Sequence, residues 1–430
     1  MTITINNKKY SDNSKEVNEN ISFVYSNDTE KFISNAKENG CSEFIKASDL
    51  KGLVDFSSIK IVGITGTNGK TTTAAALYSF LLDLGYKVAL QGTRGFFIND
   101  ERIEEYSLTT PVQLSNFEHI LKAQSHGCDF FVMEVSSHAI VQNRIEGLDF
   151  SLKILTNITR DHLDYHNTIE EYTAVKNSFF QDESPKLINK DEKKALYNIK
   201  NGFAYSLDEP STYKVQAYSF KEGMHVALQH FSETVNYSTE VTGLFNIYNL
   251  TAAIAATHIL TKKPLEKICE VVELFAGVSG RMETISSSPF IVVDFAHTPD
   301  GMKEVLKSFP TRDIIVVFGA GGDRDKEKRS VMGRVAFHYA KKIIVTSDNP
   351  RFEDPDLIIE DILNGIPKLD NVEVEVNRKL AIAKAIESAT ENSVVLILGK
   401  GDEEYQIIYD KKFPLNDKDI VNQILSISNK

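Results

Sequence analysis

The sequence has few cysteines, no long hydrophobic run and no excess of positive charge. Its three cysteines, Cys41, Cys128 and Cys269, are odd in number and far apart, which argues against a disulfide scaffold or a metal-ligand motif and is typical of reduced thiols. The N-terminus lacks the basic and apolar regions of a signal peptide, and no apolar stretch is long enough to span a bilayer. The net charge of −12 argues against a nucleic-acid or membrane partner. We therefore expect a cytoplasmic protein.

Length and composition indicate a globular protein of several domains. At 430 residues the chain is too long for one core, and its 42% hydrophobic and 25% charged residues are typical of soluble proteins. The predicted fold class is α/β with three domains. A small, shortened N-terminal α/β domain spans residues 1–57, a central parallel sheet of the phosphate-loop ATPase type spans 58–280, and a Rossmann-like parallel sheet spans 281–430.

A glycine-bearing loop between a strand and a helix is the strongest motif. Residues 59–64 are apolar and β-branched, as in a buried strand, and residues 71–84 carry apolar side chains at helical spacing. Between them, Gly66 to Lys70 offer backbone N–H groups and an ammonium to an anion, and Thr71 offers a hydroxyl to a magnesium ion. A strict phosphate loop has glycine in place of Ile64, so an ordinary turn with an exposed lysine is the alternative. The flanking pattern favours a nucleoside triphosphate site.

Two further segments place polar groups beside predicted strands. A helix is predicted after Thr109, with Thr110 as its N-cap and Pro111 at its first position; capping alone explains these residues, although adjacent threonines there also suit an anion. Residues 130–134 form a predicted buried strand, and an acid at its end, Glu134, commonly holds a nucleotide's magnesium ion, with a surface glutamate as the alternative. Four polar residues could line the same edge: Ser136, His138, Gln142 and Arg144.

Histidines and aspartates fill the loop after a strand predicted at 153–158. This loop, residues 159–166, suits either a metal site or simple loop formation. A capping box at 168–171 then opens a helix whose apolar stripe includes Lys176. The residues alone favour a lysine that extends its ammonium into water. The alternative is a partly buried neutral amine, which can react with carbon dioxide to give a carbamate, a negatively charged metal ligand.

The second half of the chain alternates strands and helices. An irregular β-rich excursion at 185–240 leads to an alanine-rich helix at 250–260 and a hinge at 278–281. Five strands are predicted after the hinge, near 290–295, 313–318, 342–346, 372–376 and 393–398. This alternation predicts a doubly wound, mostly parallel sheet whose strand-end loops meet in one crevice. Those loops carry Asp294 and His297 and residues 319–326, 348–351 and 399–403.

Taken in order, these motifs resemble the Mur ligases. The resemblance covers the chain from about residue 59 to its C-terminus and rests on Gly66–Thr72, Thr109–Pro111, Glu134–His138, Arg160–His166, Asp294–Asp300 and Asp348–Arg351. The last two segments narrow it to members that add meso-2,6-diaminopimelate to UDP-N-acetylmuramoyl-L-alanyl-D-glutamate. It implies an ATP-driven amide ligase of peptidoglycan synthesis, with a uridine-nucleotide domain, an ATPase domain and an amino-acid domain. The implied partners are small molecules, and a monomer is expected.

The resemblance also implies roles for individual residues. Those implied to bind ATP are Gly66, Thr67, Asn68, Gly69, Lys70, Thr71, Thr72, Asn249, Arg281 and Asp294. Those implied to hold Mg²⁺ are Thr71, Glu134, His162 and Lys176 as a carbamate, which reverses the interpretation of Lys176 from the residues alone. The implied catalytic residues are Lys70, His162 and Lys176.

Two sets of substrate-binding residues are implied in the same way. The muramoyl-dipeptide set is Ser14, Thr109, Thr110, Ser136, Gln142 and Arg144. The diaminopimelate set is Arg324, Asp348, Asn349, Pro350, Arg351, Gly399 and Glu403. The chain departs from the family pattern twice: Asn13-Ser14-Lys15 replaces an Asp-Ser-Arg element, and Asp402 replaces a histidine.

Rival functions share part of this pattern. A ligase like folylpolyglutamate synthase would have the same phosphate loop and metal residues, but it would add glutamate to a folate and would not need residues 348–351. A phosphate-loop kinase or molecular switch would transfer or hydrolyse phosphate without an amine. A catalytically inactive scaffold is disfavoured because each motif keeps its charged residue.

Overall fold

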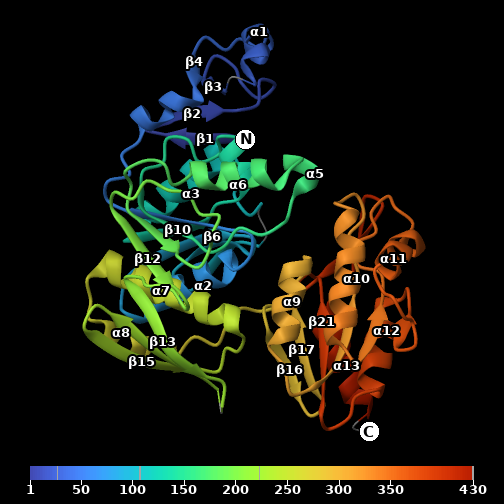
Figure 1. Ribbon diagram of the computed structural model, residues 1–430. Helices are drawn as coiled ribbons and strands as arrows, with labels where there is room; N and C mark the ends of the chain where they lie inside the picture. The colour runs from blue at the N-terminus through green and yellow to red at the C-terminus, as the bar shows by residue number, and fades with distance from the viewer. Residues whose placement is uncertain (27, 106–107, 222, 429–430) are drawn as a thin grey trace.

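Three α/β units follow one another along the chain in the computed structural model, which describes residues 1–26, 28–105, 108–221 and 223–428 (Figure 1). The predicted fold class is therefore confirmed. Within these ranges, no helix combines the length and apolar character that crossing a membrane requires.

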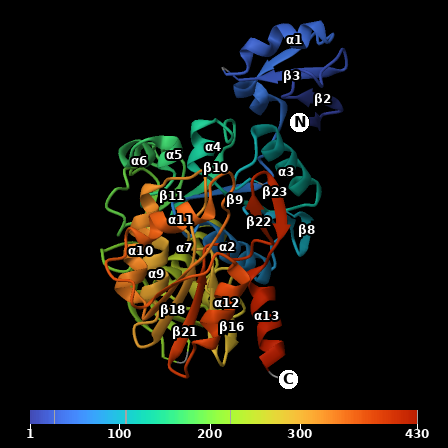
Figure 2. The same cartoon turned by 90° about the vertical axis from the view of Figure 1, so that its right-hand side faces the viewer.

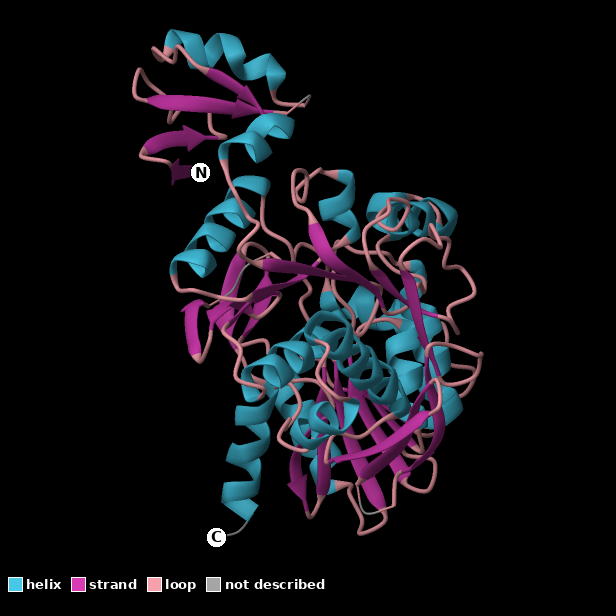
Figure 3. Cartoon of the chain, turned by 90° about the vertical axis from the view of Figure 1, so that its left-hand side faces the viewer, coloured by secondary structure: helices cyan, strands magenta, loops and turns pink. Residues whose placement is uncertain are grey.

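The N-terminal unit is a four-stranded sheet at one end of the molecule (Figure 3). Its elements are β1 (Thr2–Ile5), β2 (Lys8–Ser11), β3 (Ile21–Tyr25), the 3₁₀ helix η1 (Glu30–Phe32), α1 (Ile33–Glu38), β4 (Phe44–Lys46) and the 3₁₀ helix η2 (Ala47–Leu53). Among its described residues, one small apolar cluster around Phe23 lies entirely within this unit. Ile3, Ile5 and Leu50 belong to a core that continues into the central unit, so this end of the chain is stabilised by its neighbour.

An eleven-stranded sheet organises the central unit, in the order β15-β14-β13-β12-β11-β10-β5-β9-β6-β7-β8. Its strands are β5 (Lys60–Thr65), β6 (Val88–Gly92), β7 (Gly95–Ile98), β8 (Glu101–Glu104), β9 (Phe130–Glu134), β10 (Phe150–Leu155), β11 (Lys186–Asn189), β12 (Gly202–Ser206), β13 (Tyr213–Ser219), β14 (Met224–His230) and β15 (Glu233–Thr239). The strands from β13 to β6 run parallel, and both outer margins are antiparallel. The carboxyl ends of β5, β9 and β10 therefore meet at one edge.

Helices cover both faces of the central sheet. The helices are α2 (Lys70–Asp83), α3 (Gln113–Ser125), α4 (Ser137–Val141), α5 (Leu163–His166), α6 (Ile169–Ser178), α7 (Leu244–Thr261) and α8 (Leu265–Val272). Apolar residues of α2, α7 and α8 pack in one core, while those of α3 and α6 pack in the core shared with the N-terminal unit. This arrangement buries β5 on both faces, as its continuous apolar run predicts.

The C-terminal unit is a six-stranded sheet in the order β16-β17-β21-β18-β19-β20 (Figure 2). Its elements are β16 (Glu283–Ser287), β17 (Phe290–Asp294), α9 (Pro299–Lys307), β18 (Asp313–Phe318), α10 (Glu327–Tyr339), β19 (Lys342–Val345), α11 (Pro355–Leu363), β20 (Val372–Val374), α12 (Arg378–Glu387), β21 (Ser393–Leu398), β22 (Tyr405–Ile408), β23 (Lys411–Pro414) and α13 (Asp417–Ser428). All five strands predicted from the alternation are present and parallel, whereas the antiparallel strand β16 was not predicted.

Three local predictions were wrong in their boundaries. The helix predicted to start at Thr110 begins at Gln113, because the Thr110 hydroxyl is used in contacts with the end of β9 instead of a cap. The strand predicted at 153–158 ends at Leu155, and the helix predicted at 250–260 already begins at Leu244. The capping residue Thr168 was predicted correctly, since its side chain accepts a hydrogen bond from the Glu171 N–H.

Candidate active site

The loop between β5 and α2 is shaped by two glycines with positive φ. Gly66 has φ +151° and Gly69 has φ +85°. A Cβ on Gly66 would lie 1.8 Å from Thr156 Oγ1, and one on Gly69 would lie 2.3 Å from Asn249 Oδ1. No other residue fits either position, because the backbone conformation and the neighbouring atoms both exclude a side chain. The loop therefore presents backbone N–H groups at the start of α2, an arrangement suited to phosphate.

Lys70 is folded over this loop. Its Nζ donates hydrogen bonds to the carbonyl oxygens of Gly66 at 2.8 Å and Thr67 at 2.9 Å. Burial lowers the pKa of Lys70, and the carboxylates of Glu134 and Asp161 oppose that shift. An ammonium held between a loop and two acids is suited to neutralising a polyphosphate.

Lys176 lies behind the same loop and is only 1% exposed. Its Nζ donates to the Gly66 carbonyl oxygen at 2.9 Å and lies 4.7 Å from the centre of the Tyr172 ring. The expectation of a lysine reaching into water was therefore wrong. Burial and the nearby Lys70 ammonium hold the pKa of Lys176 well below its ordinary value, and Asp161 opposes them. Among the described residues no carboxylate forms an ion pair with Lys176, so its amine is poised to be neutral.

Glu134 ends β9 and is buried, which excludes the surface-glutamate alternative. Its carboxylate accepts hydrogen bonds from Thr71 Oγ1 at 3.1 Å and from the Thr93 N–H at 3.0 Å. Thr93 was not predicted, although it follows the neighbouring strand β6, and strand-end position was the signal that could have found it.

The oxygen atoms of Thr71 and Glu134 fit one side of a magnesium site. Mg²⁺ prefers oxygen ligands and commonly takes one or two carboxylates with phosphate oxygens and water. Within the described ranges, no group of three or more histidine, cysteine, aspartate or glutamate side chains is arranged to hold a metal.

His162 lies in the histidine-rich loop beside Asp161, at 3.5 Å, with its ring centre 5.0 Å from that of His138. It is not among the hydrogen-bond partners that the described structure gives Glu134. Partial burial lowers the pKa of His162 to about 4, with Lys70 and His138 adding to the shift and Asp161 opposing it. The ring is therefore neutral near pH 7, the form in which imidazole binds metals.

The three residues predicted to hold adenosine lie around the junction of the central and C-terminal units. Asn249 on α7 contacts α2, the helix that follows the phosphate loop, by accepting from Thr73 Oγ1 at 3.4 Å. The Arg281 guanidinium lies 4.0 Å from the centre of the Phe295 ring. Asp294 accepts from the Met282 N–H at 2.7 Å, and burial raises the pKa of Asp294. This carboxylate ties the segment after the predicted hinge to the C-terminal sheet.

Five of the six residues predicted to hold the muramoyl dipeptide gather at the end of β9. Thr110 Oγ1 donates to the Glu134 carbonyl oxygen at 2.9 Å and accepts from the Ser136 N–H at 2.9 Å. Arg144 Nη1 donates to the Thr110 carbonyl oxygen at 2.7 Å, and the same guanidinium holds the Gln142 side chain. Thr109 Oγ1 joins the group at 3.1 Å from Thr93 Oγ1.

The sixth, Ser14, lies in the N-terminal unit. Its hydroxyl donates to Asn35 Oδ1 at 2.8 Å, so it is engaged within its own unit.

The residues predicted to hold diaminopimelate come from three strand ends of the C-terminal sheet. Asn349 Nδ2 donates to Glu403 Oε2 at 2.9 Å, and the buried Lys400, which was not predicted, donates to the same oxygen at 2.7 Å. Half-buried Arg351 has φ +52° and donates through Nη1 to the Gly322 carbonyl oxygen at 2.8 Å. Asp348 is buried, 4.0 Å from a guanidinium nitrogen of Arg378. The predicted convergence of these loops is therefore observed.

A buried arginine braces two of these loops. Arg329 on α10, 1% exposed, binds Glu353 through two hydrogen bonds of 3.0 and 2.8 Å and Asp361 through one of 2.8 Å. Glu353 also accepts from the Asp323 N–H at 2.6 Å, which joins the loop after β18 to the loop after β19. These hydrogen bonds, chiefly those from Arg329, lower the pKa of Glu353 from 4.5 to about 2.

We expect Glu353→Gln to lower the free energy of unfolding by about 3 kcal/mol at pH 7, since each pKa unit corresponds to about 1.4 kcal/mol. A carboxylate with a depressed folded-state pKa stabilises fully above its unfolded value. In the wild type this contribution should fade as the pH falls from 4.5 towards about 2. Urea unfolding from pH 7 to pH 2 measures it. Glu304→Gln, which removes a more exposed pair with Lys307, is the control and should change stability by less than about 1 kcal/mol. Equal stability of Glu353→Gln and wild type at pH 7 would contradict the assignment.

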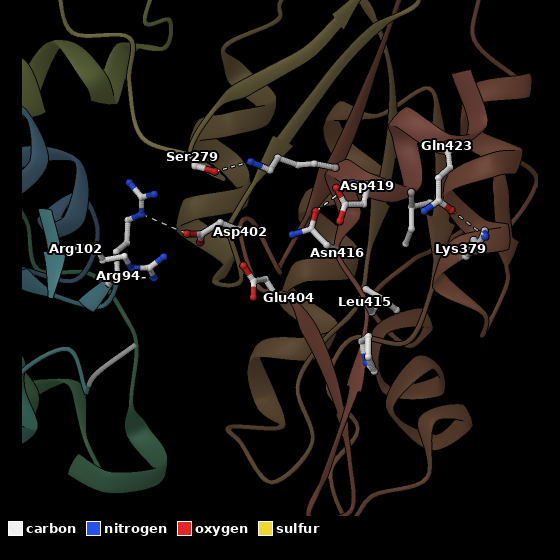
Figure 4. A pocket seen from close by; sticks show the side chains of 13 residues that line it. Arg94, Arg102, Ser279, Lys379, Asp402, Glu404, Leu415, Asn416, Asp419 and Gln423 are labelled. Atoms are coloured by element: carbon white, nitrogen blue, oxygen red, sulfur yellow. Dashed lines mark hydrogen bonds and ion pairs between the residues drawn. The ribbon is translucent and has the colours of Figure 1, made fainter. Parts of the chain in front are cut away.

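Ion pairs connect the central and C-terminal units across the crevice. Arg160 Nη2 donates to Glu327 Oε2 at 2.6 Å, and Arg324 lies 3.7 Å from Asp164. At a separate point Arg94 faces Asp402 at 3.4 Å beside a cavity of about 680 Å³ (Figure 4). Asp402, where the family pattern has a histidine, thus contacts the central unit. The histidine-rich loop of the central unit and the segment after β18 therefore lie against each other.

Comparison with known proteins identifies the family. The Mur ligase middle domain matches residues 64–257, and the Mur ligase, glutamate ligase domain matches residues 280–401. A UDP-N-acetylmuramoyl-L-alanyl-D-glutamate--2,6-diaminopimelate ligase of Wolinella succinogenes is 52% identical over 411 residues, 96% of this chain and 94% of that protein. A ligase of the same name from Helicobacter pylori is 49% identical over 434 residues, covering 98% and 97%.

Solved structures agree with this relation. A structure of a ligase with that same name has a TM-score of 0.69 and 28% identity, covering 98% of this chain and 95% of the other. Mycobacterium tuberculosis folylpolyglutamate synthase in complex with ADP has a TM-score of 0.67 at 18% identity, covering 82% and 90%, which shows a shared fold. On the family matches and the near-full-length identity, the chain belongs to the Mur ligases, a family of ATP-dependent ligases.

Proposed function

We propose that this ligase joins meso-2,6-diaminopimelate to UDP-N-acetylmuramoyl-L-alanyl-D-glutamate at the expense of ATP. The observation that carries the proposal is the near-full-length identity, about one residue in two, to two ligases of that name. The three buried, unpaired cysteines suit a reducing compartment, so we place the reaction in the cytoplasm.

The proposed reaction has two steps. The D-glutamyl γ-carboxylate attacks the γ-phosphorus of ATP, forming an acyl phosphate and releasing ADP. An amine of diaminopimelate then attacks the acyl carbon, and phosphate leaves as the amide bond forms and the amine loses a proton. Such a reaction needs mainly alignment of its three substrates and neutralisation of phosphate charge.

The chain's own groups suit these tasks. The N–H groups at the start of α2 and the Lys70 ammonium would bind the triphosphate. Thr71 and Glu134 would hold a magnesium ion, which would supply further positive charge beside the phosphates. Thr109, Thr110 and Arg144 would hold the dipeptide at the same sheet edge, because their hydrogen bonds already join them to the segment after β6, to the end of β9 or to one another.

The amino acid would enter from the C-terminal side of the crevice. Diaminopimelate carries two carboxylates and two ammonium groups, and the loops there offer the guanidinium of Arg351 and the carboxylates of Asp348 and Glu403. This charge pattern favours a diamino diacid over the glutamate that a folylpolyglutamate synthase adds. The likeness to the folylpolyglutamate synthase supports the fold alone.

Release of ADP by the purified protein tests the proposal. We expect release only when ATP, UDP-N-acetylmuramoyl-L-alanyl-D-glutamate and diaminopimelate are all present, and mass spectrometry should find the amide product. A tetrahydrofolate with glutamate is the control pair and should give none. Release that needs no amine would indicate a phosphotransferase or a hydrolase, and release with the folate pair would favour the rival ligase.

A further inference from the structure

Four polar side chains form a continuous line of hydrogen bonds in the central unit. The line leads to the end of β9 where the dipeptide is proposed to bind, called the dipeptide edge below. It starts at Glu104 at the end of β8, passes through His119 on α3 and Gln91 on β6, and ends at Asn116 on α3. His119, Gln91 and Asn116 are all buried. The distances along the line are 3.0 Å, 2.6 Å and 2.8 Å. None of these four residues was predicted from the sequence to take part in the site.

Asn116 joins the two segments that flank the dipeptide edge. Its Nδ2 donates to the carbonyl oxygen of Pro111 at 3.1 Å and to that of Arg144 at 2.8 Å. Pro111 follows Thr110 directly, and the Arg144 side chain returns to the Thr110 carbonyl oxygen. The fully buried Asn116 amide therefore sets the distance between the Thr109–Pro111 segment and Arg144, which are proposed to bind the same substrate.

Counting donors fixes the direction of every bond in the line. Carbonyl oxygens only accept, so the amide nitrogen of Asn116 must face Pro111 and Arg144. Its oxygen then accepts from Gln91 Nε2, and Gln91 Oε1 must accept from His119 Nδ1–H. His119 Nε2 then faces the Glu104 carboxylate at 3.0 Å. Without a proton on Nε2 both atoms are acceptors, so this contact requires one more proton.

No rearrangement removes that requirement. If His119 instead carried its proton on Nε2, its bare Nδ1 would need the Gln91 amide reversed. That reversal would turn the Gln91 oxygen toward the Asn116 oxygen, and reversing Asn116 would set its oxygen against two carbonyls. An imidazolium held by Glu104 satisfies all four residues at once.

The surroundings of His119 act in both directions. Burial is the larger influence and holds the pKa of His119 below its ordinary value, while Glu104 opposes the shift by its charge and its hydrogen bond. Two other charged groups act from its own helix: Glu118 raises the pKa and Lys122 lowers it. The imidazole stacks on Phe96 with ring centres 4.2 Å apart and an interplanar angle of 7°, which keeps the ring directed at Glu104.

We propose that Asn116, Gln91, His119 and Glu104 are positioning residues that hold the Thr109–Pro111 segment against Arg144 for the muramoyl-dipeptide nucleotide, and that this hold weakens when the proton between His119 and Glu104 is lost. This inference rests on the proposed function, because the substrate is the one named there. Among the described residues these four side chains form hydrogen bonds to neither the phosphate loop nor the C-terminal loops, so their effect should fall on one substrate.

The first test replaces Asn116 with alanine in the full-length enzyme. Two carbonyls lose their donor, and we expect the KM for the dipeptide nucleotide to rise by roughly 10- to 100-fold, while the KM values for ATP and diaminopimelate change by less than about twofold. Gln124→Ala is the matched control. Gln124 lies on the same helix and also donates to two acceptors, Asp55 O and Ser58 Oγ, at the far end of α3, so its KM values should match wild type.

The second test replaces the exposed Glu104 with glutamine. An amide N–H at that position donates to the bare Nε2 of a neutral His119, so the line stays satisfied without the titrating proton. Because the pKa of His119 lies below its ordinary value, we expect the KM of the wild type for the dipeptide nucleotide to rise as the pH is raised from the acid side towards 6.5, and that of Glu104→Gln to stay nearly flat.

Two results would overturn the inference while leaving the proposed function intact. One is an Asn116→Ala enzyme whose KM for the dipeptide nucleotide equals that of wild type or rises equally for all three substrates. The other is an identical pH profile of this KM in wild type and Glu104→Gln. A wild-type protein that forms no amide from the two proposed substrates would overturn the proposed function, and the inference with it.

Discussion

Lys176→Ala is expected to lose about 10²- to 10³-fold in kcat and to retain its affinity for ATP within a few-fold, because losing one preorganised charge at a developing phosphate charge typically costs that much. Lys176 is 1% exposed, hydrogen-bonded only to Gly66 O among the described residues, and has no ion-pair partner there. A buried amine with a strongly lowered pKa is nucleophilic at neutral pH. We therefore propose that it attacks carbon dioxide, forming an N–C bond and releasing a proton, to become a carbamate.

A carbamate would convert a buried amine into an anion behind the phosphate loop, next to the Lys70 ammonium. Carbon-13 NMR of the protein equilibrated with labelled bicarbonate measures this directly, and the signal should vanish in Lys176→Ala. Lys153→Met is the control, because Lys153 is buried but, unlike Lys176, is paired with a carboxylate, that of Asp182 at 2.5 Å. A short carboxylic acid should restore part of the activity of Lys176→Ala. An active wild type without the labelled signal would refute the carbamate.

Arg351→Ala is expected to raise the KM for diaminopimelate by roughly thirty- to several-thousand-fold, since a buried charged contact is worth about 2–5 kcal/mol. The Arg351 guanidinium is half-buried, and burial and the neighbouring Arg324 lower its pKa. An unpaired arginine in this position is unfavourable, and a distal carboxylate would bind it through two charge-assisted hydrogen bonds. L-lysine lacks that carboxylate and would leave the guanidinium unpaired, so we expect strong preference for meso-diaminopimelate over L-lysine.

Steady-state kinetics with each amino acid test this assignment. The KM for ATP should stay near that of wild type, and Arg351→Lys should restore little, because an ammonium cannot reproduce the planar fork. Arg312→Ala is the control: Arg312 lies in the same unit, is exposed, and also donates one hydrogen bond to a backbone carbonyl, that of Glu391. A wild type that uses L-lysine as well as diaminopimelate would contradict the role of Arg351.

The Glu403 carboxylate already has hydrogen-bond partners within the protein. Glu403 was predicted to bind diaminopimelate, for which its carboxylate suits an ammonium group, but one of its oxygens already accepts from Lys400 and Asn349. The substrate's ammonium would therefore share this carboxylate with a buried lysine. Lys400 comes two residues before Asp402 and was visible in the sequence, yet nothing in its spacing distinguishes a buried lysine from an exposed one.

The sequence predicted the parts of this fold that depend on local pattern. Apolar β-branched runs located β5, β9 and the parallel strands of the C-terminal sheet, and glycines located the phosphate loop. The sequence-based predictions were wrong where a segment distant in the sequence determines the contacts of a side chain. Thr110 does not cap a helix because the end of β9 occupies its hydroxyl, and Lys176 does not reach water because the phosphate loop covers it.

For the candidate site, the residues at strand ends could be predicted and the contacts between distant segments could not. Residues at strand ends converge because parallel strands share an edge, which follows from topology alone. The line from Glu104 to Asn116 could not be predicted, since its members come from three elements and show no motif. The roles of the site residues toward ATP, magnesium and the two other substrates remain predictions, to be tested by the variants above.

The position of β5 in the sheet has a consequence for biosynthesis. This strand, which carries the phosphate loop, pairs with β9 on one side and β10 on the other, and those strands end at Glu134 and Leu155. Ribosomes add about 5–20 residues per second, so the second edge of β5 stays unfilled for roughly 5 to 20 s after Thr65 is made. Until Glu134 is made both edges of this apolar strand are open on the nascent chain, and an open strand edge is a template for pairing with another chain.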